Sequence, residues 1–316
     1  MEQPKTGKTY KILINGKWTT TKNRRDVINP ATGKAIAKVP AASAKDARRA
    51  LKASLKGREQ MVALDAWERA EILEKASELM EKDKRLFINT IVKESGKTVS
   101  EATGEVNASI ARLKYGAIEA LSIKGEFLKG DNAPSHRNRL AFVSRKPVGT
   151  VLAILPFNYP LFTGVGKVAP ALAGGNSVIL KPAGDTPLSA ILFTKVLIDA
   201  GLPKKGIQVI TGHSSEIGDV LCSSESVSLI SLTGSTATGE HISKTAGLKK
   251  LHMELGGKAS ALVLKDADIE LAAKEVAKGG LKYSGQRCDA IAFPVAGFMT
   301  SLLFFVVVHL PLINIL

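Results

Sequence analysis

The sequence predicts an α/β protein built on a doubly wound parallel sheet. A short, continuous apolar run at 151–155 is typical of a strand that is buried on both faces, and a second strand is predicted at 177–180. Segments with helical character follow them at 187–200 and 214–222. A regular alternation of strand and helix favours parallel strands joined by crossover helices, with ligands bound at the carboxyl ends of the strands.

The first part of the chain has a different pattern. Residues 9–40 are predicted to form short strands with turns, and Asn15-Gly16 is a strong hairpin signal. Ser43 and Asp46 are spaced as in a capping box and predict a helix to about residue 54. Apolar residues at helical spacing then predict two helices in 65–95, broken near Asp83, and a longer helix at 98–123.

The formal net charge of +15 could indicate nucleic acid, a membrane surface or small anions. The basic residues are interleaved with acids, as in Glu68-Arg69 and Glu74-Lys75, and no aromatic-plus-basic motif of a nucleic-acid module is present. We therefore expect a solvated basic surface and no nucleic-acid partner, with attraction of a phosphate-bearing ligand as a second possibility.

Two cysteines, Cys222 and Cys288, give no disulfide framework. The opening ten residues are polar and contain no apolar segment of a signal peptide, so a reduced cytoplasmic setting is expected. Cys222 ends an apolar helical stretch and is expected to be a small buried residue.

Two glycine-rich segments carry the chemistry. Glu254 precedes Gly256-Gly257, and Cys288 follows Gly285-Gln286-Arg287. A cysteine attacks a carbonyl as its thiolate, and a carboxylate can activate water to cleave the resulting thioester. The alternatives are an acid at the end of a strand and a small hydrophobic residue on a helix.

Three further segments each follow a predicted strand. Asn158, in a proline-rich turn, could donate to an oxyanion or merely cap the next helix. Lys181 could bind a ribose or phosphate or be an ordinary surface lysine. Gly234-Ser235 precedes a predicted helix, whose amino terminus could attract a pyrophosphate, although the spacing is not that of GxGxxG.

Together these segments resemble the aldehyde dehydrogenase superfamily, whose signatures are an ELGGK-like and a GQRC-like stretch. They occur in the family's order over residues 151–288, and a looser likeness reaches back to about residue 10. The resemblance implies a Rossmann-like variant of the sheet and a second, truncated α/β catalytic domain. It also implies that Cys288 is the nucleophile, Glu254 the base and Asn158 the oxyanion-hole residue, with Cys288 and Glu254 facing one pocket.

The resemblance also implies a nicotinamide cofactor and no metal. The residues expected to contact the cofactor are Phe157, Lys181, Gly184, Gly234, Ser235 and Leu255. Many NAD-preferring relatives have a glutamate three positions after the lysine, where this chain has Gly184. Because no carboxylate then repels a 2′-phosphate, the sequence favours NADP over NAD.

Within the superfamily, residues 153–160 and 283–288 are most similar to non-phosphorylating glyceraldehyde-3-phosphate and lactaldehyde dehydrogenases. Arg287 and Tyr159 are therefore candidate substrate-binding residues, although Arg287 could equally form a structural ion pair. Bacterial glyceraldehyde-3-phosphate enzymes have a further arginine near the position of Ser122. Its replacement by serine keeps succinate semialdehyde and other small aldehydes open as substrates.

The expected domains are a cofactor-binding domain at 1–255 with a β-hairpin arm near 125–146, the start of a catalytic domain at 256–291, and an apolar tail at 292–316. Residues 290–316 contain no Asp, Glu, Lys or Arg. A transmembrane helix, a segment translated out of frame and a truncated protein with a buried last strand would each account for the tail. The abrupt end of the family pattern between Ile291 and Phe293 favours the out-of-frame reading. A membrane association is not expected, because an anchor directly after a catalytic cysteine would pull the active site to the bilayer.

Two functions follow from these interpretations. The first is NAD(P)-dependent oxidation of a small-molecule aldehyde by a family whose members are homo-oligomers. The second is a catalytically inactive remnant that retains nucleotide binding, because relatives continue beyond the cysteine with segments that complete the catalytic domain and join subunits.

Overall fold

The computed structural model describes residues 7–296. The chain divides into two compact units, Met1–Glu254 and Leu255–Leu316, which are described separately below. Among residues 7–296, no helix combines the length and the apolar character that crossing a bilayer requires.

A seven-stranded sheet in the order β11-β10-β7-β8-β9-β1-β2 forms the centre of the first unit. Its five parallel strands pair through β11-β10-β7-β8-β9, which confirms the predicted doubly wound sheet. These strands are β7 (Thr150–Ile154), β8 (Ser177–Lys181), β9 (Ile207–Val209), β10 (Leu229–Thr233) and β11 (Lys250–Glu254).

The sheet is mixed rather than purely parallel, because the amino-terminal hairpin joins its edge. β1 (Ile12–Ile14) pairs antiparallel with β9 through Leu13 and Val209, and β2 (Lys17–Thr19) pairs antiparallel with β1. Asn15 and Gly16 both have a positive φ, 55° and 73°, as the predicted two-residue hairpin turn requires. The apolar β1 is fully buried, so it extends the core instead of forming a separate sheet.

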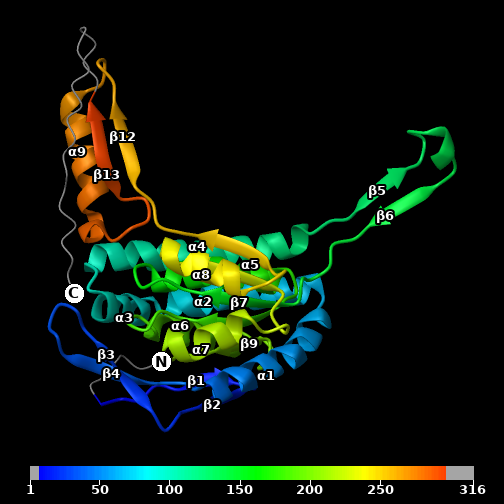
Figure 1. Cartoon of the computed structure of the whole chain (residues 1–316), viewed down its shortest axis with the longest axis horizontal. Coiled ribbons are helices and arrows are strands. Elements are labelled where there is room, and N and C mark those ends of the chain that lie inside the picture. Colours follow the sequence, from blue (N-terminus) through cyan, green and yellow to red (C-terminus); the bar gives the residue numbers. More distant parts are fainter. Residues whose placement is uncertain (1–6, 297–316) are drawn as a thin grey trace. The chain divides into compact units, whose positions relative to one another are not determined.

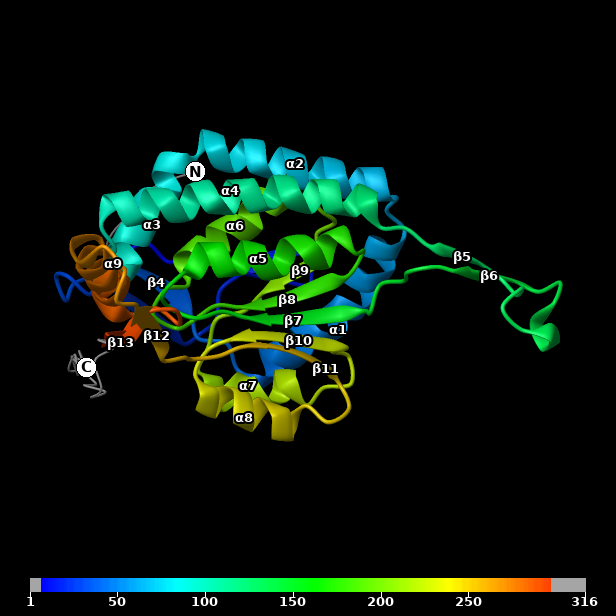
Figure 2. The same cartoon turned by 90° about the horizontal axis from the view of Figure 1, so that it is seen from above.

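Helices cover both faces of this sheet (Figure 2). One face carries α5 (Pro160–Ala173) and α6 (Leu188–Asp199). Outside them lie α2 (Ala66–Lys82), α3 (Lys84–Ser95) and α4 (Val99–Ser122). The other face carries α1 (Ala44–Val62), α7 (Ser214–Cys222) and α8 (Thr236–Thr245).

The predicted helix boundaries hold except at the end of α1. The capping box of Ser43 and Asp46 is present, and Asp83 separates α2 from α3. However, α1 continues to Val62 rather than ending near residue 54. Gly57 and Met61 extend its buried face by two more turns, and Gly57 allows close contact with the backbone at Lys205.

Two small sheets accompany the main sheet. β3 (Arg24–Ile28) and β4 (Ala35–Pro40) form an antiparallel pair. β5 (Glu126–Lys129) and β6 (Leu140–Val143) form the arm, which extends away from the sheet of its own unit (Figure 1). All eight arm residues in these strands are exposed, and a short 3₁₀ turn, Pro134–His136, lies between them.

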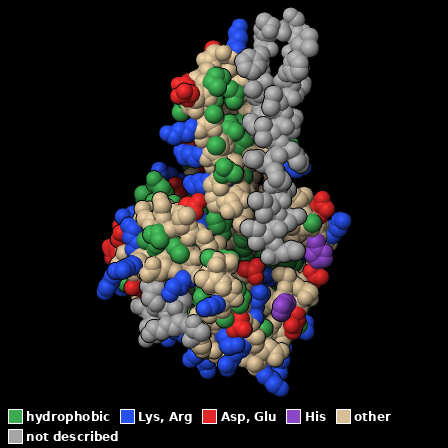
Figure 3. Space-filling view, turned by 90° about the vertical axis from the view of Figure 1, so that its left-hand side faces the viewer, with side chains coloured by type: hydrophobic (Ala, Val, Ile, Leu, Met, Phe, Trp, Pro, Cys, Tyr) green, Lys and Arg blue, Asp and Glu red, His purple; other side chains and the backbone are tan. Residues whose placement is uncertain are grey.

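The second unit contains a βαβ arrangement. β12 (Ala259–Val263) and β13 (Ile291–Ala296) are parallel neighbours, joined through α9 (Ile269–Leu281) and the 3₁₀ turn Lys282–Gly285. Hydrophobic side chains, drawn in green, are visible on the surface of this unit in the upper part of Figure 3. The predicted tail begins within β13, and the interpretations of its remainder concern residues that lie outside the described part.

Candidate active site

Four strands of the main sheet end at the same edge. Ile154 of β7 is paired with Lys181 of β8, and Leu232 of β10 is paired with Ile154. Thr233 of β10 is paired with Glu254, the last residue of β11. Because these strands are parallel, the segments that follow them emerge side by side, which brings together the Asn158 turn, Lys181, the Gly234-Ser235 loop and Glu254.

The Asn158 turn leads into α5, whose amino terminus is capped from another helix. Glu105 of α4 accepts hydrogen bonds from the backbone N–H groups of Leu161 and Phe162, at 3.0 and 3.1 Å. Tyr159, not Asn158, occupies the N-cap position. The interpretation of Asn158 as the helix cap is therefore wrong, because Glu105 performs that task.

A buried ion pair supports this cap. Lys97 Nζ lies 2.6 Å from Glu105 Oε2, and both side chains are inaccessible to solvent. Lys97 Nζ also lies 3.4 Å from the centre of the Tyr159 ring, a cation–π contact. The residues that directly follow Asn158 are thus held by one charged cluster that the sequence motifs did not indicate.

Glu254 ends β11 with 63% of its side chain exposed. The backbone N–H of Gly234 donates to the Glu254 carbonyl oxygen at 3.0 Å. The loop that precedes α8 and the candidate base are therefore joined by a direct backbone hydrogen bond.

A chain of polar side chains leads from Glu254 into the protein. His252 Nε2 lies 3.6 Å from Glu254 Oε1, and His252 Nδ1 lies 3.1 Å from Ser231 Oγ. Lys167 Nζ donates to Ser231 Oγ at 3.1 Å. Burial lowers the pKa of Lys167 to about 8, with Glu254 acting in the opposite direction and Arg112 adding to the decrease.

Sequence analysis did not identify these polar residues, although two signals were available. Lys167 is a charged residue inside the apolar segment that forms α5. His252 is two residues before Glu254 on a strand, so both side chains lie on the same face. The hydroxyl of Ser231, which connects them, depends on the pairing of β10 with β11.

Lys181 ends β8 in a buried position and donates from Nζ to Ser214 Oγ at 3.0 Å. Only 7% of the residue is exposed, so the interpretation as an ordinary surface lysine is wrong. Burial lowers the pKa of Lys181, nearby Cys222 raises it, and Arg25 lowers it further. Beyond Lys181, the hydroxyl of Thr186 donates to the Phe157 carbonyl oxygen at 3.1 Å.

Cys222 is buried at 2% exposure, as predicted. Burial raises the pKa of this thiol to about 11. It therefore remains a neutral thiol at ordinary pH and is not a competing nucleophile.

Ser235 is the N-cap residue of α8. Its Oγ accepts from the Thr238 backbone N–H at 3.2 Å and lies 2.8 Å from the Thr238 hydroxyl. Gly234 directly precedes this cap at the carboxyl end of β10. A helix amino terminus at such a strand end is suited to an anionic phosphate.

Cys288 lies in the second unit, in an exposed loop between α9 and β13. Tyr283, Ser284 and Gly285 before it all have positive φ values, so the chain turns sharply there. A Cβ on Gly257 would lie 3.0 Å from the Cys288 carbonyl oxygen, which explains why glycine suits that position. The interpretation of Cys288 as a small hydrophobic residue on a helix is wrong, because the loop exposes it.

Two positions bear on substrate recognition. The Arg287 side chain is 11% exposed; Nη2 donates to the Gly279 carbonyl oxygen at 2.6 Å, and Nη1 lies 3.5 Å from Asp289. These contacts match the ion-pair alternative, and substrate binding by Arg287 stays a prediction. Ser122 is exposed at the end of α4, where its hydroxyl donates to the Ile118 carbonyl oxygen at 2.9 Å.

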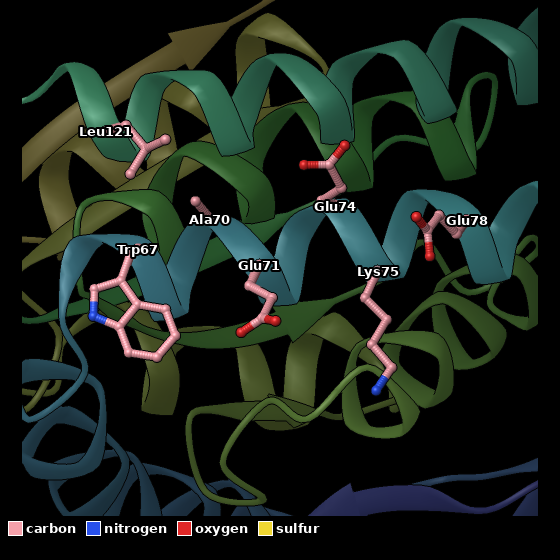
Figure 4. A pocket seen from close by; sticks show the side chains of 7 residues that line it. All are labelled: Trp67, Ala70, Glu71, Glu74, Lys75, Glu78 and Leu121. Carbon is pink, nitrogen blue, oxygen red and sulfur yellow. The ribbon is translucent and has the colours of Figure 1, made fainter.

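Two surface hollows contain none of the predicted site residues. One, of about 500 Å³, lies along α2 and is bordered by Trp67, Ala70, Glu71, Glu74, Lys75, Glu78 and Leu121 (Figure 4). The other, of about 480 Å³, is bordered by Lys8, Thr9, Tyr10, Lys11, Trp18, Ile191, Leu192 and Lys195. The strand ends, rather than these hollows, define the candidate site. In residues 7–296, no group of three or more His, Cys, Asp or Glu side chains is placed to hold a metal ion.

Comparisons with known proteins identify the family. The model of the aldehyde dehydrogenase family matches residues 18–293. The chain is 40% identical over 285 residues to an NADP-dependent glyceraldehyde-3-phosphate dehydrogenase of Streptococcus equinus, covering 90% of this chain and 60% of that protein. It is 38% identical over 287 residues to a 3-sulfolactaldehyde dehydrogenase of Priestia aryabhattai, covering 90% of this chain and 59% of that protein.

A solved structure gives the same result. The NADP-dependent glyceraldehyde-3-phosphate dehydrogenase of Bacillus halodurans, complexed with NADP, superposes with a TM-score of 0.89 at 39% identity, covering 91% of this chain and 61% of that one. The chain belongs to the aldehyde dehydrogenase family, as the motifs predicted. It spans about 60% of the length of these relatives.

Proposed function

We propose that this chain takes part in the oxidation of an aldehyde to a carboxylic acid with NADP, or alternatively NAD, as cofactor. The observation that carries the proposal is the common edge of β7, β8, β10 and β11. In a doubly wound sheet this edge is where ligands bind. Here it carries a buried cation at Lys181, a helix amino terminus after Gly234 and a carboxylate at Glu254.

The residues at this edge suit a dinucleotide. Lys181 presents a cation at the end of β8, and the amino terminus of α8 suits the pyrophosphate. Position 184 is a glycine, so its own side chain adds no negative charge there. NADP is therefore the preferred cofactor in the proposal, and both glyceraldehyde-3-phosphate relatives are named as NADP-dependent. Phe157 and Leu255 remain predicted cofactor contacts.

The proposed reaction begins with the Cys288 thiolate. Its sulfur adds to the aldehyde carbon, and the new alkoxide accepts hydrogen bonds from the Asn158 amide and the Cys288 backbone N–H. The nicotinamide, when bound, supplies the hydride acceptor. Glu254 then removes a proton from water, the hydroxide attacks the thioester of Cys288, and the acid leaves as the thiolate is restored.

The polar residues behind Glu254 support this role. His252, Ser231 and Lys167 form a series of contacts that leads away from the carboxylate. We assign to them the positioning of Glu254 and the removal of the proton that it takes from water. Tyr159, beside Asn158, remains a candidate substrate contact.

The substrate class proposed is a small aldehyde with an anionic end group. The names of the relatives include glyceraldehyde 3-phosphate and 3-sulfolactaldehyde, which share this character. Succinate semialdehyde and lactaldehyde should be tested as well. Arg287, the candidate residue for binding a phosphate or carboxylate of the substrate, already contacts Gly279 and Asp289, so aldehydes without a phosphate stay candidate substrates.

A second candidate function is nucleotide binding without turnover. One observation favours it: the Cys288 loop belongs to a unit in which none of the described apolar side chains is buried. A nucleophile displaced by about 1 Å can lose about a hundredfold in rate. Such a protein would bind NADP and leave aldehydes unchanged.

Calorimetric titration with NADP, followed by an assay of NADPH formation with the four aldehydes, separates the two functions. Cys288→Ala should abolish turnover and leave NADP binding intact, whereas Cys222→Ala, which changes the buried thiol, should retain turnover. Turnover that persists in Cys288→Ala would overturn the mechanism. Binding without turnover in the native chain would establish the second function.

A further inference from the structure

A second cation lies against the loop that follows Lys181. Arg25, on β3, is 27% exposed, and its guanidinium group covers the backbone of Gly184. A Cβ at position 184 would lie 2.9 Å from Arg25 Cζ, closer than real Cβ contacts occur, and 3.1 Å from Nη2, which is tighter than most. Gly184 therefore does more than omit a carboxylate, because its missing side chain makes room for the arginine.

Asp185 fixes the direction of this guanidinium. Arg25 Nη2 lies 3.2 Å from Asp185 Oδ1, and 80% of the Asp185 side chain is exposed. A guanidinium has five N–H donors, so this contact leaves donors for a further acceptor. The exposed carboxylate is well screened by water, which limits its repulsion of an incoming anion.

Arg25 and Lys181 are close enough to influence each other. Burial lowers the pKa of Lys181 first, Cys222 opposes that change, and the positive charge of Arg25 lowers it further. Two cations from sequence-distant elements thus lie near the end of β8, where the charge of Arg25 disfavours the charged form of Lys181. An anion of high charge between them would remove this repulsion.

We propose that Arg25 and Lys181 together bind the 2′-phosphate of NADP, and that Arg25 is the residue that makes this chain prefer NADP to NAD. The inference rests on the proposed function, which places the adenosine ribose at the end of β8. It adds a residue from the amino-terminal strands to a site otherwise made from the central sheet. Arginine suits this role because its planar donors match a phosphate in two-point geometry.

The expected discrimination follows from the charge of the ligand. A hydrogen bond to a charged group contributes more to binding than a neutral one, and its loss weakens binding by about ten- to a hundredfold. NAD carries a hydroxyl group at the same position and gains no charge-assisted contact. Removing Arg25 should therefore affect NADP and spare NAD.

The test uses calorimetric titrations of the full chain with NADP, NAD, adenosine 2′,5′-bisphosphate and AMP. Arg25→Gln should weaken NADP and the bisphosphate by about ten- to a hundredfold and change NAD and AMP by less than about twofold. Arg24→Gln is the matched control, because Arg24 is the exposed neighbour on the same strand and points to the opposite face. It should leave all four affinities unchanged.

A second variant reaches the same contact without removing the arginine. Gly184→Ala places a Cβ where the guanidinium lies, and should reduce the preference for NADP in the same way. Arg25→Lys, which keeps the charge but not the planar fork, should retain part of the preference. Thermal unfolding of each variant shows whether it is folded before its binding is compared.

Three outcomes decide the matter. A loss of NADP and bisphosphate binding in both Arg25→Gln and Gly184→Ala, with NAD unchanged, supports the inference. An unchanged ratio of NADP to NAD affinity in either folded variant overturns it while the proposed function stands. A native chain that binds neither dinucleotide overturns the proposed function, and this inference with it.

Discussion

The two units differ in how they support their functional residues. In the first unit, β7, β8 and β9 are buried almost throughout, and the cofactor-side residues extend from them. In the second unit, β12 alternates between half-buried and exposed residues, and α9 buries only Gly280. Among the described residues, no apolar side chain after Ala246 is buried. The residues proposed to bind the cofactor therefore extend from a buried core, whereas Cys288, the proposed nucleophile, lies in a single βαβ layer.

The difference teaches that the proposed cofactor binding and the proposed chemistry depend on different units, so one could be retained without the other. Lys181, Gly234 and Glu254 are fixed by strands that pair on both sides or lie beside such strands. Cys288 depends on a turn with three consecutive positive φ values and on the close approach of Gly257. Substitutions that change packing should consequently change the free energy of unfolding strongly in the first unit and weakly in the second.

The largest effect is expected at the buried ion pair of the first unit. Glu105→Ala leaves Lys97 charged and buried without its partner, and removes the acceptor of two helix N–H groups. The free energy of unfolding should fall by about 3–5 kcal/mol in urea denaturation followed by circular dichroism. Glu59→Ala breaks the exposed ion pair with Lys56 and should change the free energy of unfolding by less than about 1 kcal/mol. A loss below 1 kcal/mol in Glu105→Ala would contradict the contrast.

A pH-dependent contribution is expected from Glu94, which is buried in the same unit. Its carboxyl group accepts from the Leu188 and Ser189 N–H groups and from the Ser189 hydroxyl. Burial nevertheless raises the pKa of Glu94 from 4.5 to about 7. Between these values the folded chain holds a proton that the unfolded chain releases, so rising pH removes stability.

The size of this contribution is about 3 kcal/mol across the window from pH 4.5 to 7. The stability of the native chain relative to Glu94→Gln should be greatest below pH 4.5 and should decline as the pH increases towards 7. Denaturant unfolding of both proteins at several pH values measures the difference. A difference that is constant with pH, or that has the opposite slope, would show that Glu94 is ionised in the folded chain.

Equivalent caps in the two units should have unequal consequences for the main unfolding transition. Ser43 caps α1 in the first unit, and Asp268 caps α9 in the second, where its carboxylate accepts from the Leu271 N–H at 3.0 Å. Ser43→Ala should lower the unfolding free energy of the first unit by about 1 kcal/mol. Asp268→Ala should leave that transition unchanged and increase amide hydrogen exchange in α9 alone. Equal shifts of the main transition would mean that the units unfold together.

The smallest effect is expected at an exposed leucine of the second unit. Leu264 is 57% exposed, so Leu264→Ser should change the unfolding free energy by no more than about 0.5 kcal/mol in the same denaturation experiment. The matched substitution Leu152→Ser in β7, where exposure is 0%, should lower it by several kcal/mol. A loss above 1 kcal/mol in Leu264→Ser would reveal that this surface is covered by a partner in solution.

Much of the first unit could be predicted from local patterns. The apolar runs identified the parallel strands, Asn15-Gly16 the hairpin and Ser43 the start of α1, because each signal acts over a few residues. The pairing of Leu13 with Val209 could not be predicted, since it depends on contacts between distant segments. The contacts of Lys97 with Glu105 and of Arg25 with Gly184 could not be predicted for the same reason.

Site residues that belong to a sequence motif could be predicted. Site residues that are brought to the site only by the tertiary fold were missed. Lys181 and Glu254 lie at strand ends as their positions indicated. Lys167 was overlooked because a single charge inside an apolar helix resembles an isolated exception, and its contact with Ser231 exists only in the folded sheet. The joint action of Glu254 and Cys288 stays a prediction.

The cap that Glu105 provides for α5 has a consequence for the order of synthesis. Lys97 and Glu105 leave the ribosome before Leu161 and Phe162, so the acceptor is made before its two backbone donors. Until those donors are synthesised, the nascent chain must either leave the Lys97–Glu105 pair in water or bury it while Glu105 lacks two of its hydrogen-bond donors. Co-translational docking of the α3–α4 region should thus await the emergence of α5, and a fragment that stops before Pro160 should remain loosely packed there.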